Sequence, residues 1–248
     1  MTTYKEIRGT NIEAVASDPS NPVEGQVWYN TTTNVVKGLG FNSGSWATSG
    51  NLNTAREFMG GAGTQAAALG FGGSPPFSGF VATELYNGSN WTEVNDLNTA
   101  RYWMGSCGTS TAALAFGGGL NNGPSTSVDT ETWNGTNWTE VNNLSTARSG
   151  VGGAGTNTAA LAFGGNIPPS TADTETWNGT NWTEVNNLNT ARYGPSGAKS
   201  GTNTATLAFG GSGPTGATEL WNGTNWTEVN DMNVARGEAA GAGTQTAA

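Results

Sequence analysis

The stretch DTETWNGTNWTEVNNL occupies residues 129–144 and recurs without a change at 173–188. Related versions stand at 82–97 (ATELYNGSNWTEVNDL) and at 217–232 (ATELWNGTNWTEVNDM). At its centre, Asn-Gly readily adopts the positive φ that a tight hairpin turn requires, and short segments rich in Thr, Val and Trp flank it. The stretch therefore predicts a β-hairpin that the chain builds several times.

Two further markers give the period of the repeat. The tripeptide Phe-Gly-Gly recurs at 71–73, 116–118, 163–165 and 209–211. An arginine that follows Thr-Ala or Val-Ala recurs at Arg56, Arg101, Arg148, Arg192 and Arg236. Successive arginines are 44 to 47 residues apart, and no apolar pattern with a period of 3.6 residues lies between them. This spacing fits a four-stranded propeller blade and excludes a helical repeat.

Each repeat places two aromatic residues five positions apart, on either side of the hairpin turn. The pairs are Phe41/Trp46, Tyr86/Trp91, Trp133/Trp138, Trp177/Trp182 and Trp221/Trp226. Because the members of a pair face each other across the hairpin, we interpret them as packing between neighbouring sheets, with a sugar-binding platform as the alternative. Five pairs predict five blades.

Taken together, these elements resemble kelch repeats over residues 25–248. The shared features are a small-residue strand after Arg, an apolar strand that ends in Phe-Gly-Gly, and an acidic residue before an aromatic pair. The resemblance implies an all-β fold, a kelch-like β-propeller. The chain lacks the His that kelch repeats usually carry after Arg, so no particular kelch partner can be transferred to it.

The repeat markers predict the blade boundaries. Four blades span about 57–101, 102–148, 149–192 and 193–236. Residues 25–56 supply only three strands of another, and 237–248 supply its first strand. Pairing of this C-terminal strand with the N-terminal blade would close a ring of five four-stranded blades and protect the open sheet edge. A fragment of a longer array is the alternative. Residues 1–24 are predicted to form an N-terminal arm or docking segment.

The charged residues of the repeats are expected to be structural. Each Arg would pair with a Glu of the neighbouring blade, and the tryptophans would fill the space between blades. The alternative is a ring of carboxylates for a metal or for acid–base chemistry. The inter-blade residues are Arg56, Arg101, Arg148, Arg192, Arg236, Glu84, Glu131, Glu175, Glu219, Trp46, Trp91, Trp138, Trp182 and Trp226.

Composition narrows the function classes. The formal net charge is −9 without a basic cluster, which disfavours a nucleic-acid partner. The chain has no His, and its one cysteine, Cys107, is expected to be a buried apolar residue on an inner strand. We therefore expect no catalytic residues, no metal and no cofactor, hence no enzyme. No apolar run reaches membrane-spanning length, so we expect no membrane insertion.

Binding is expected where the repeats differ. The variable places are the loops after Phe-Gly-Gly and the two or three residues after each Arg. Loops on a rigid scaffold commonly carry binding sites. The candidate ligand-binding residues are Phe77, Phe80, Tyr102, Trp103 and Tyr193. We expect the two kinds of variable place to lie at opposite ends of the blades.

The segment SDPSNPVEGQVWYNTTTNVVKG at 17–38 resembles bacteriophage virion and tail-fibre-type proteins, notably those of marine phages. The resemblance implies a non-enzymatic virion appendage or decoration protein, located in the virion. Its partners would be other virion proteins or further copies of the chain, and host-surface glycan. The alternatives are a lectin-like protein of the bacterial cell surface and an intracellular kelch-type protein-interaction module.

Overall fold

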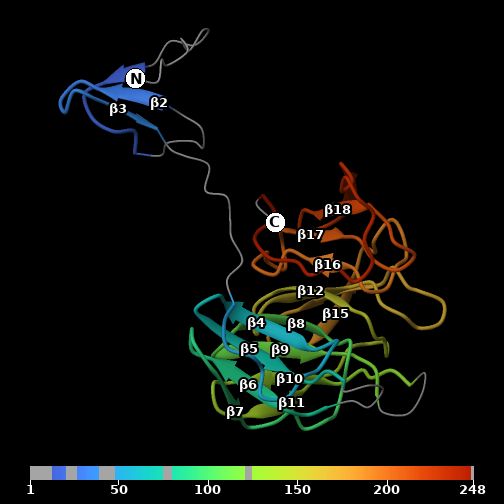
Figure 1. Ribbon diagram of the computed structural model, residues 1–248. Helices are drawn as coiled ribbons and strands as arrows, with labels where there is room; N and C mark the ends of the chain where they lie inside the picture. The colour runs from blue at the N-terminus through green and yellow to red at the C-terminus, as the bar shows by residue number, and fades with distance from the viewer. Residues whose placement is uncertain (1–12, 21–26, 39–47, 75–79, 121–124, 247–248) are drawn as a thin grey trace. The chain divides into compact units, whose positions relative to one another are not determined.

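A computed structural model of the chain describes residues 13–20, 27–38, 48–74, 80–120 and 125–246. The chain forms two compact units, Met1–Thr48 and Ser49–Ala248, which we call unit 1 and unit 2. The described residues form strands, turns and bends without any helix (Figure 1). Over these ranges no helix is therefore long and apolar enough to cross a membrane.

Unit 1 contains a three-stranded sheet of β1 (Glu13–Val15), β2 (Val27–Asn30) and β3 (Val35–Gly38). Strand β1 pairs with β2 in parallel, and β2 and β3 form an antiparallel hairpin. The predicted boundary between residues 24 and 25 thus falls between two strands of one sheet. The boundary was predicted there because residues 1–24 are poor in apolar side chains. The backbone pairing of β1 with β2 does not depend on apolar side chains, so composition does not reveal it.

Asp18 ties the segment after β1 to the hairpin. Its carboxylate accepts hydrogen bonds from Lys37 Nζ, Trp28 Nε1 (3.0 Å) and Asn30 Nδ2 (2.8 Å). These bonds, that of Lys37 foremost, hold the pKa of Asp18 well below its usual range.

The described residues of unit 2 form four antiparallel four-stranded sheets, each built from consecutive strands. Sheet I comprises β4 (Gly60–Thr64), β5 (Ala67–Phe71), β6 (Thr83–Tyr86) and β7 (Trp91–Val94). Sheet II comprises β8 (Gly105–Thr109), β9 (Ala112–Phe116), β10 (Thr130–Trp133) and β11 (Trp138–Val141). Sheet III comprises β12 (Gly152–Gly155), β13 (Ala160–Phe163), β14 (Thr174–Trp177) and β15 (Trp182–Val185). Sheet IV comprises β16 (Ser196–Gly197), β17 (Thr206–Phe209), β18 (Thr218–Trp221) and β19 (Trp226–Val229).

The first strand of each sheet is built of small residues for a steric reason. Strands β4, β8, β12 and β16 contact one another in succession (Figure 1). A methyl group added at Gly105 would overlap the ring of Phe116, and one at Gly152 would overlap the ring of Phe163. Glycine at these positions therefore lets the buried phenylalanine lie across the neighbouring strand. An all-β chain of repeated four-stranded sheets is confirmed, and this arrangement is compatible with a propeller.

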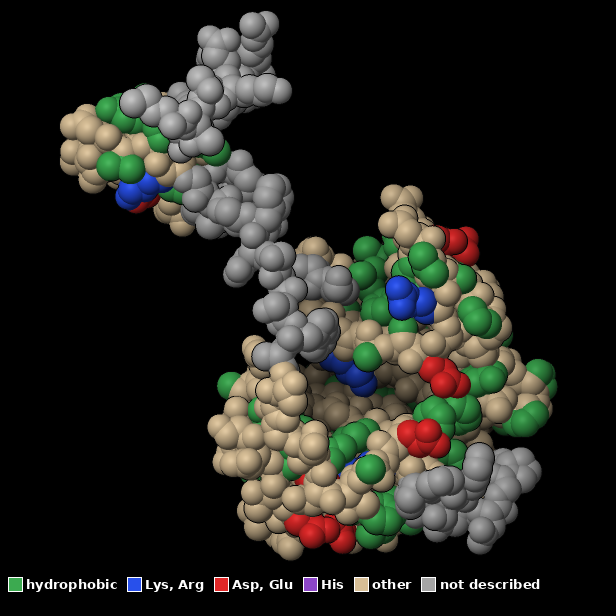
Figure 2. Space-filling view, in the orientation of Figure 1, with side chains coloured by type: hydrophobic (Ala, Val, Ile, Leu, Met, Phe, Trp, Pro, Cys, Tyr) green, Lys and Arg blue, Asp and Glu red, His purple; other side chains and the backbone are tan. Residues whose placement is uncertain are grey.

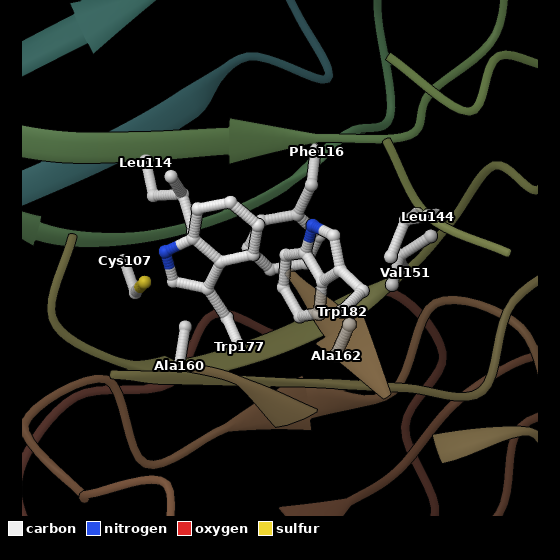
Figure 3. Packing of buried hydrophobic residues seen from close by; sticks show 9 residues of the cluster. All are labelled: Cys107, Leu114, Phe116, Leu144, Val151, Ala160, Ala162, Trp177 and Trp182. Carbon is white, nitrogen blue, oxygen red and sulfur yellow. The ribbon is translucent and has the colours of Figure 1, made fainter. Parts of the chain in front are cut away.

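Tryptophan side chains fill the space between neighbouring sheets. Trp138 packs edge-on against Phe71 with 4.7 Å between ring centroids, and Trp182 packs in the same way against Phe116 at 5.0 Å. Figure 3 shows the second of these clusters, in which the rings of Trp177, Trp182 and Phe116 lie together. Trp226 repeats the contact between sheets III and IV.

Hydrogen bonds from the indole nitrogens fix the position of each tryptophan against the preceding sheet. Trp182 Nε1 donates to Thr130 Oγ1 of the preceding sheet at 3.0 Å, and Trp138 and Trp226 make the equivalent bonds. Four aromatic pairs face each other across their hairpins as expected, at Tyr86/Trp91, Trp133/Trp138, Trp177/Trp182 and Trp221/Trp226. The predicted pair Phe41/Trp46 lies outside the described residues.

The C-terminal segment follows sheet IV without forming a named strand. The Ser200 amide donates to Gly243 O at 2.8 Å, and Ser196 Oγ donates to Ala239 O. Gly241 approaches Gly197 as closely as Gly197 approaches Gly153, so the segment lies where the first strand of a further sheet would lie. The described strand pairings do not include the predicted pairing of this segment with the N-terminal blade, since β2 pairs with β1 and β3. Closure and a count of five blades stay predictions.

Candidate functional site

Buried ion pairs link each repeat to the next. Arg101 Nη2 lies 2.7 Å from Glu131 Oε1, and both side chains are completely buried. The same pair recurs at three more places, as Arg56–Glu84, Arg148–Glu175 and Arg192–Glu219. The Glu131 carboxylate also accepts the Asn98 amide at 2.8 Å. The charged groups of these four Arg–Glu pairs are therefore buried in contacts between repeats of the scaffold.

Two residues of the predicted inter-blade set differ from the rest. Arg236 is exposed and has no ion pair within the described ranges. Trp91 is only half-buried, because sheet I has no described sheet before it. Trp46 lies outside the described residues. Within the described part of the chain, His, Cys, Asp and Glu side chains form no group of three or more that could hold a metal ion.

A line of unusual backbone conformations lies at one end of unit 2. The second residue after each of the five repeat arginines has positive φ, which favours glycine. The five residues are Phe58 (53°), Trp103 (53°), Gly150 (61°), Gly194 (63°) and Glu238 (52°). We call this set the αL arc. For residues other than glycine this conformation costs roughly 1–3 kcal/mol, so the side chains of Phe58 and Trp103 are held in place against strain.

Backbone hydrogen bonds join successive members of the αL arc. The Trp103 amide donates to Phe58 O at 2.9 Å, and the Gly150 amide donates to Trp103 O at 2.7 Å. The Gly194 amide donates to Gly150 O at 2.7 Å. Because each bond connects the segments that enter neighbouring sheets, the arc fixes where these segments stand relative to one another.

Aromatic side chains gather on this arc. The Trp103 ring lies 4.7 Å from the ring of Phe58, 6.3 Å from that of Tyr102 and 5.9 Å from that of Tyr193. We call these four residues the aromatic rim. All four are partly exposed, and 37 % of Phe58 is accessible. They come from the segments that enter sheets I, II and IV, so residues far apart in the sequence converge on one surface.

The rim contains three of the five predicted ligand-binding residues, namely Tyr102, Trp103 and Tyr193. Phe77 lies outside the described residues. Phe80 does not belong to the rim, and its ring stands 6.0 Å from the guanidinium carbon of Arg56. Phe58 was missed by sequence reasoning, although its place after Arg56 matches that of Trp103 after Arg101.

The two kinds of variable place lie at the same end of the sheets, so the expectation of opposite ends was wrong. Residues after Arg pair with the first residues after Phe-Gly-Gly, as Glu57 does with Ser74, Tyr102 with Gly119 and Ser149 with Asn166. The reason is the antiparallel order. The start of the first strand and the end of the second must meet at one edge.

A channel of about 1000 Å³ runs between the first strands of the four sheets. Phe58 and Trp103 of the rim line it, together with Glu57, Glu238 and the small residues of β4, β8, β12 and β16. Figure 2 shows the hollow in this face of unit 2, with a basic side chain within it and acidic side chains beside it. The small residues leave room that larger side chains would fill.

Lys199 also lines the channel. Its Nζ donates to the carbonyl and to the hydroxyl oxygen of Ser106, each at 3.1 Å. Burial lowers the pKa of the Lys199 ammonium. Sequence reasoning did not single out Lys199, although the two residues inserted after it, Ser200 and Gly201, mark this repeat as different from the others.

Cys107 stands beside Ser106 on β8 and is buried in the core between sheets II and III (Figure 3). Burial raises the pKa of its thiol to about 12, so the thiol is neutral at physiological pH. The predicted buried, apolar role is confirmed.

Comparison of the chain with models of protein families gives no match, and neither does comparison with curated proteins.

Proposed function

We propose that the chain is a non-enzymatic, kelch-like β-propeller that binds a saccharide at the aromatic rim. The observation that carries this proposal is the convergence of four partly exposed aromatic rings at one end of the channel. The hairpins of the scaffold are nearly identical, whereas the segments that form the rim differ in every repeat. A surface that varies on a constant scaffold is where recognition is expected.

The chemistry of the rim suits a sugar ring. Aromatic faces offer a flat apolar surface to the C–H groups of a pyranose, while the tyrosine hydroxyls and nearby backbone groups can hydrogen-bond its hydroxyls. Phe58 and Trp103 hold strained αL backbones, in positions where two other repeats have glycine. Strain retained at an exposed aromatic residue supports a role in binding.

The test compares the parent chain with Trp103→Ala and Tyr102→Ala on a glycan array, followed by calorimetry with the best ligand. Val234→Ala is the control, because 60 % of Val234 is exposed and it lies outside the rim. We expect the rim variants to bind roughly tenfold more weakly, from the loss of about 1.4 kcal/mol of stacking, and the control to bind normally. No binding by the parent chain, or unchanged binding by both rim variants, would refute the proposed site.

We further propose that the protein is a virion component, either a tail fibre, an appendage or a decoration protein, that attaches to host-surface glycan. The resemblance of residues 17–38 to phage tail-fibre-type proteins supports this assignment. Its partners would be other virion proteins or further copies of the chain. Proteomics of purified particles tests the assignment, and absence of the chain from the particles would overturn it.

The second candidate function is that of a lectin-like protein on a bacterial surface. The same aromatic rim favours it, because the rim fits a sugar wherever the protein is located. Cell-surface labelling of the bacterium distinguishes it from a virion component. An intracellular kelch-type interaction module has less support, since the rim region offers few basic side chains to hold a peptide.

A further inference from the structure

We propose that Lys199 is an anion-binding group within the channel and that the ligand is an acidic saccharide. Its carboxylate would reach Lys199 while its ring lies against the aromatic rim. This inference rests on the proposed saccharide function and names the class of sugar.

The chain departs from its own repeat at Lys199. The corresponding position of the other three sheets is held by Gly63, Gly108 and Gly155, all at positive φ between 107° and 110°. Sheet IV has a lysine there, followed by the insertion Ser200-Gly201. The only lysine of unit 2 thus stands where the scaffold itself uses glycine.

The side chain of Lys199 reaches across the channel. It starts from the segment after β16 in sheet IV and ends on Ser106 of β8 in sheet II, although sheet III lies between these two in sequence. An ammonium group has three N–H donors, and the described acceptors are the two oxygens of Ser106. Ser106 Oγ is shared with Gly61, whose amide donates to it at 3.2 Å. The ammonium can therefore take a further acceptor.

The positive charge of Lys199 has no anionic partner among the described residues. No carboxylate forms an ion pair with Lys199 there, since the described ion pairs of unit 2 all involve arginine. The neighbouring thiol of Cys107 is neutral at physiological pH, because its pKa is about 12. A largely buried charge without a counter-charge is costly, and an anion that enters the channel would relieve that cost.

The spacing of the two groups fits one ligand. Ser106 follows Trp103 by three residues, so their backbones are at most roughly 10 Å apart. A sugar ring stacked on Trp103 can direct a carboxylate substituent over this span. Glu57 and Glu238 also line the channel and belong to the segments around the αL arc. Their charge disfavours a dense polyanion and favours a ligand with one carboxylate per ring.

The test measures binding of glucuronic-acid oligomers and of glucose oligomers of equal length by isothermal titration calorimetry. It uses the full chain, Lys199→Met and Lys199→Arg. We expect the parent chain to bind the acidic oligomer at least tenfold more tightly, and Lys199→Met to bind both oligomers equally. Lys199→Arg should keep the preference because it keeps the charge. Trp103→Ala should weaken both ligands alike.

The outcomes separate this inference from the proposed function. Binding of both oligomers without an acidic preference, or a preference that survives in Lys199→Met, would overturn the role of Lys199 and leave the rim as a sugar site. No binding of any saccharide would overturn both.

A second measurement does not depend on a variant. The chain has three lysines, Lys5, Lys37 and Lys199, so NMR of ¹³Cε-labelled lysine gives a small set of signals. We expect the glucuronic-acid oligomer to shift the signal of Lys199 alone and glucose oligomers to shift none. An unmoved Lys199 signal at saturating acidic ligand would contradict the inference.

Discussion

The ion pair between Arg148 and Glu175 gives the most exacting test of how the sheets are held together. Arg148 Nη2 lies 2.9 Å from Glu175 Oε1, and the side chains are 0 % and 2 % exposed. Arg148 Nη1 also donates to Gly164 O at 3.0 Å. In Arg148→Met the apolar stem remains but the charge is lost, which leaves Glu175 buried with the Ser145 amide, at 2.9 Å, as its one described donor. An uncompensated buried charge costs about 3–5 kcal/mol, a large part of the stability of a typical domain.

Arg236 provides the matched control, because it occupies the same repeat position but is exposed and has no described ion pair. Urea unfolding, followed by tryptophan fluorescence and far-UV circular dichroism, gives the free energy of unfolding of each variant. We expect Arg148→Met to lower it by about 3–5 kcal/mol and Arg236→Met to change it by less than about 0.5 kcal/mol. The double variant Arg148→Met/Glu175→Leu should regain much of the loss, because neither charge then remains. Equal losses for Arg148→Met and Arg236→Met would refute the argument that burial of the pair, rather than its sequence position, makes it stabilising.

Three other outcomes follow from the same packing. The Cys107 thiol, whose pKa rises from 9.0 to about 12 on folding, should resist iodoacetamide in the native protein and react after unfolding. As the pH rises, the thiol ionises in the unfolded chain before it ionises in the folded protein. The contribution of the buried Cys107 thiol to stability should therefore be complete below pH 9 and decline between pH 9 and 12, and Cys107→Ala should remove that decline. Thr130→Val deprives the buried indole of Trp182 of its acceptor and should cost about 1–3 kcal/mol in chemical denaturation, whereas Thr218→Val, whose hydroxyl receives no described indole bond, should cost less. Glu238→Gly should raise the melting temperature by relieving a φ of 52°, and a fall would show that its carboxylate makes a stabilising contact.

Much of the scaffold could be predicted because its signals are local. The Asn-Gly turn and the alternation of side chains fix each hairpin. Trp133 therefore faces Trp138 regardless of how the sheet packs against its neighbours. The 44- to 47-residue period then predicts repeated four-stranded sheets. The pairing of Arg56, Arg101, Arg148 and Arg192 with a Glu of the next repeat also follows from recurrence, because identical charges in successive units indicate a shared structural contact.

The candidate site could be predicted only in part. Tyr102, Trp103 and Tyr193 stood out as aromatic residues in variable places, but their sequence positions do not reveal that their rings meet. Phe58 and Lys199 were missed, since a pattern shows which side chains vary and not which of them point toward a common space.

The sequence by itself determined the all-β repeat, the hairpins and the small-residue strands, because turns, strand alternation and steric room depend on neighbours along the chain. That both variable places share one end follows from the antiparallel order of the first two strands of each sheet, so this feature is local. Only the tertiary structure decided that the rings of Trp103 and Tyr193 meet and that Lys199 meets a serine 93 residues away. These contacts depend on how whole sheets stand against one another, which the packing of many side chains fixes together and no local pattern encodes.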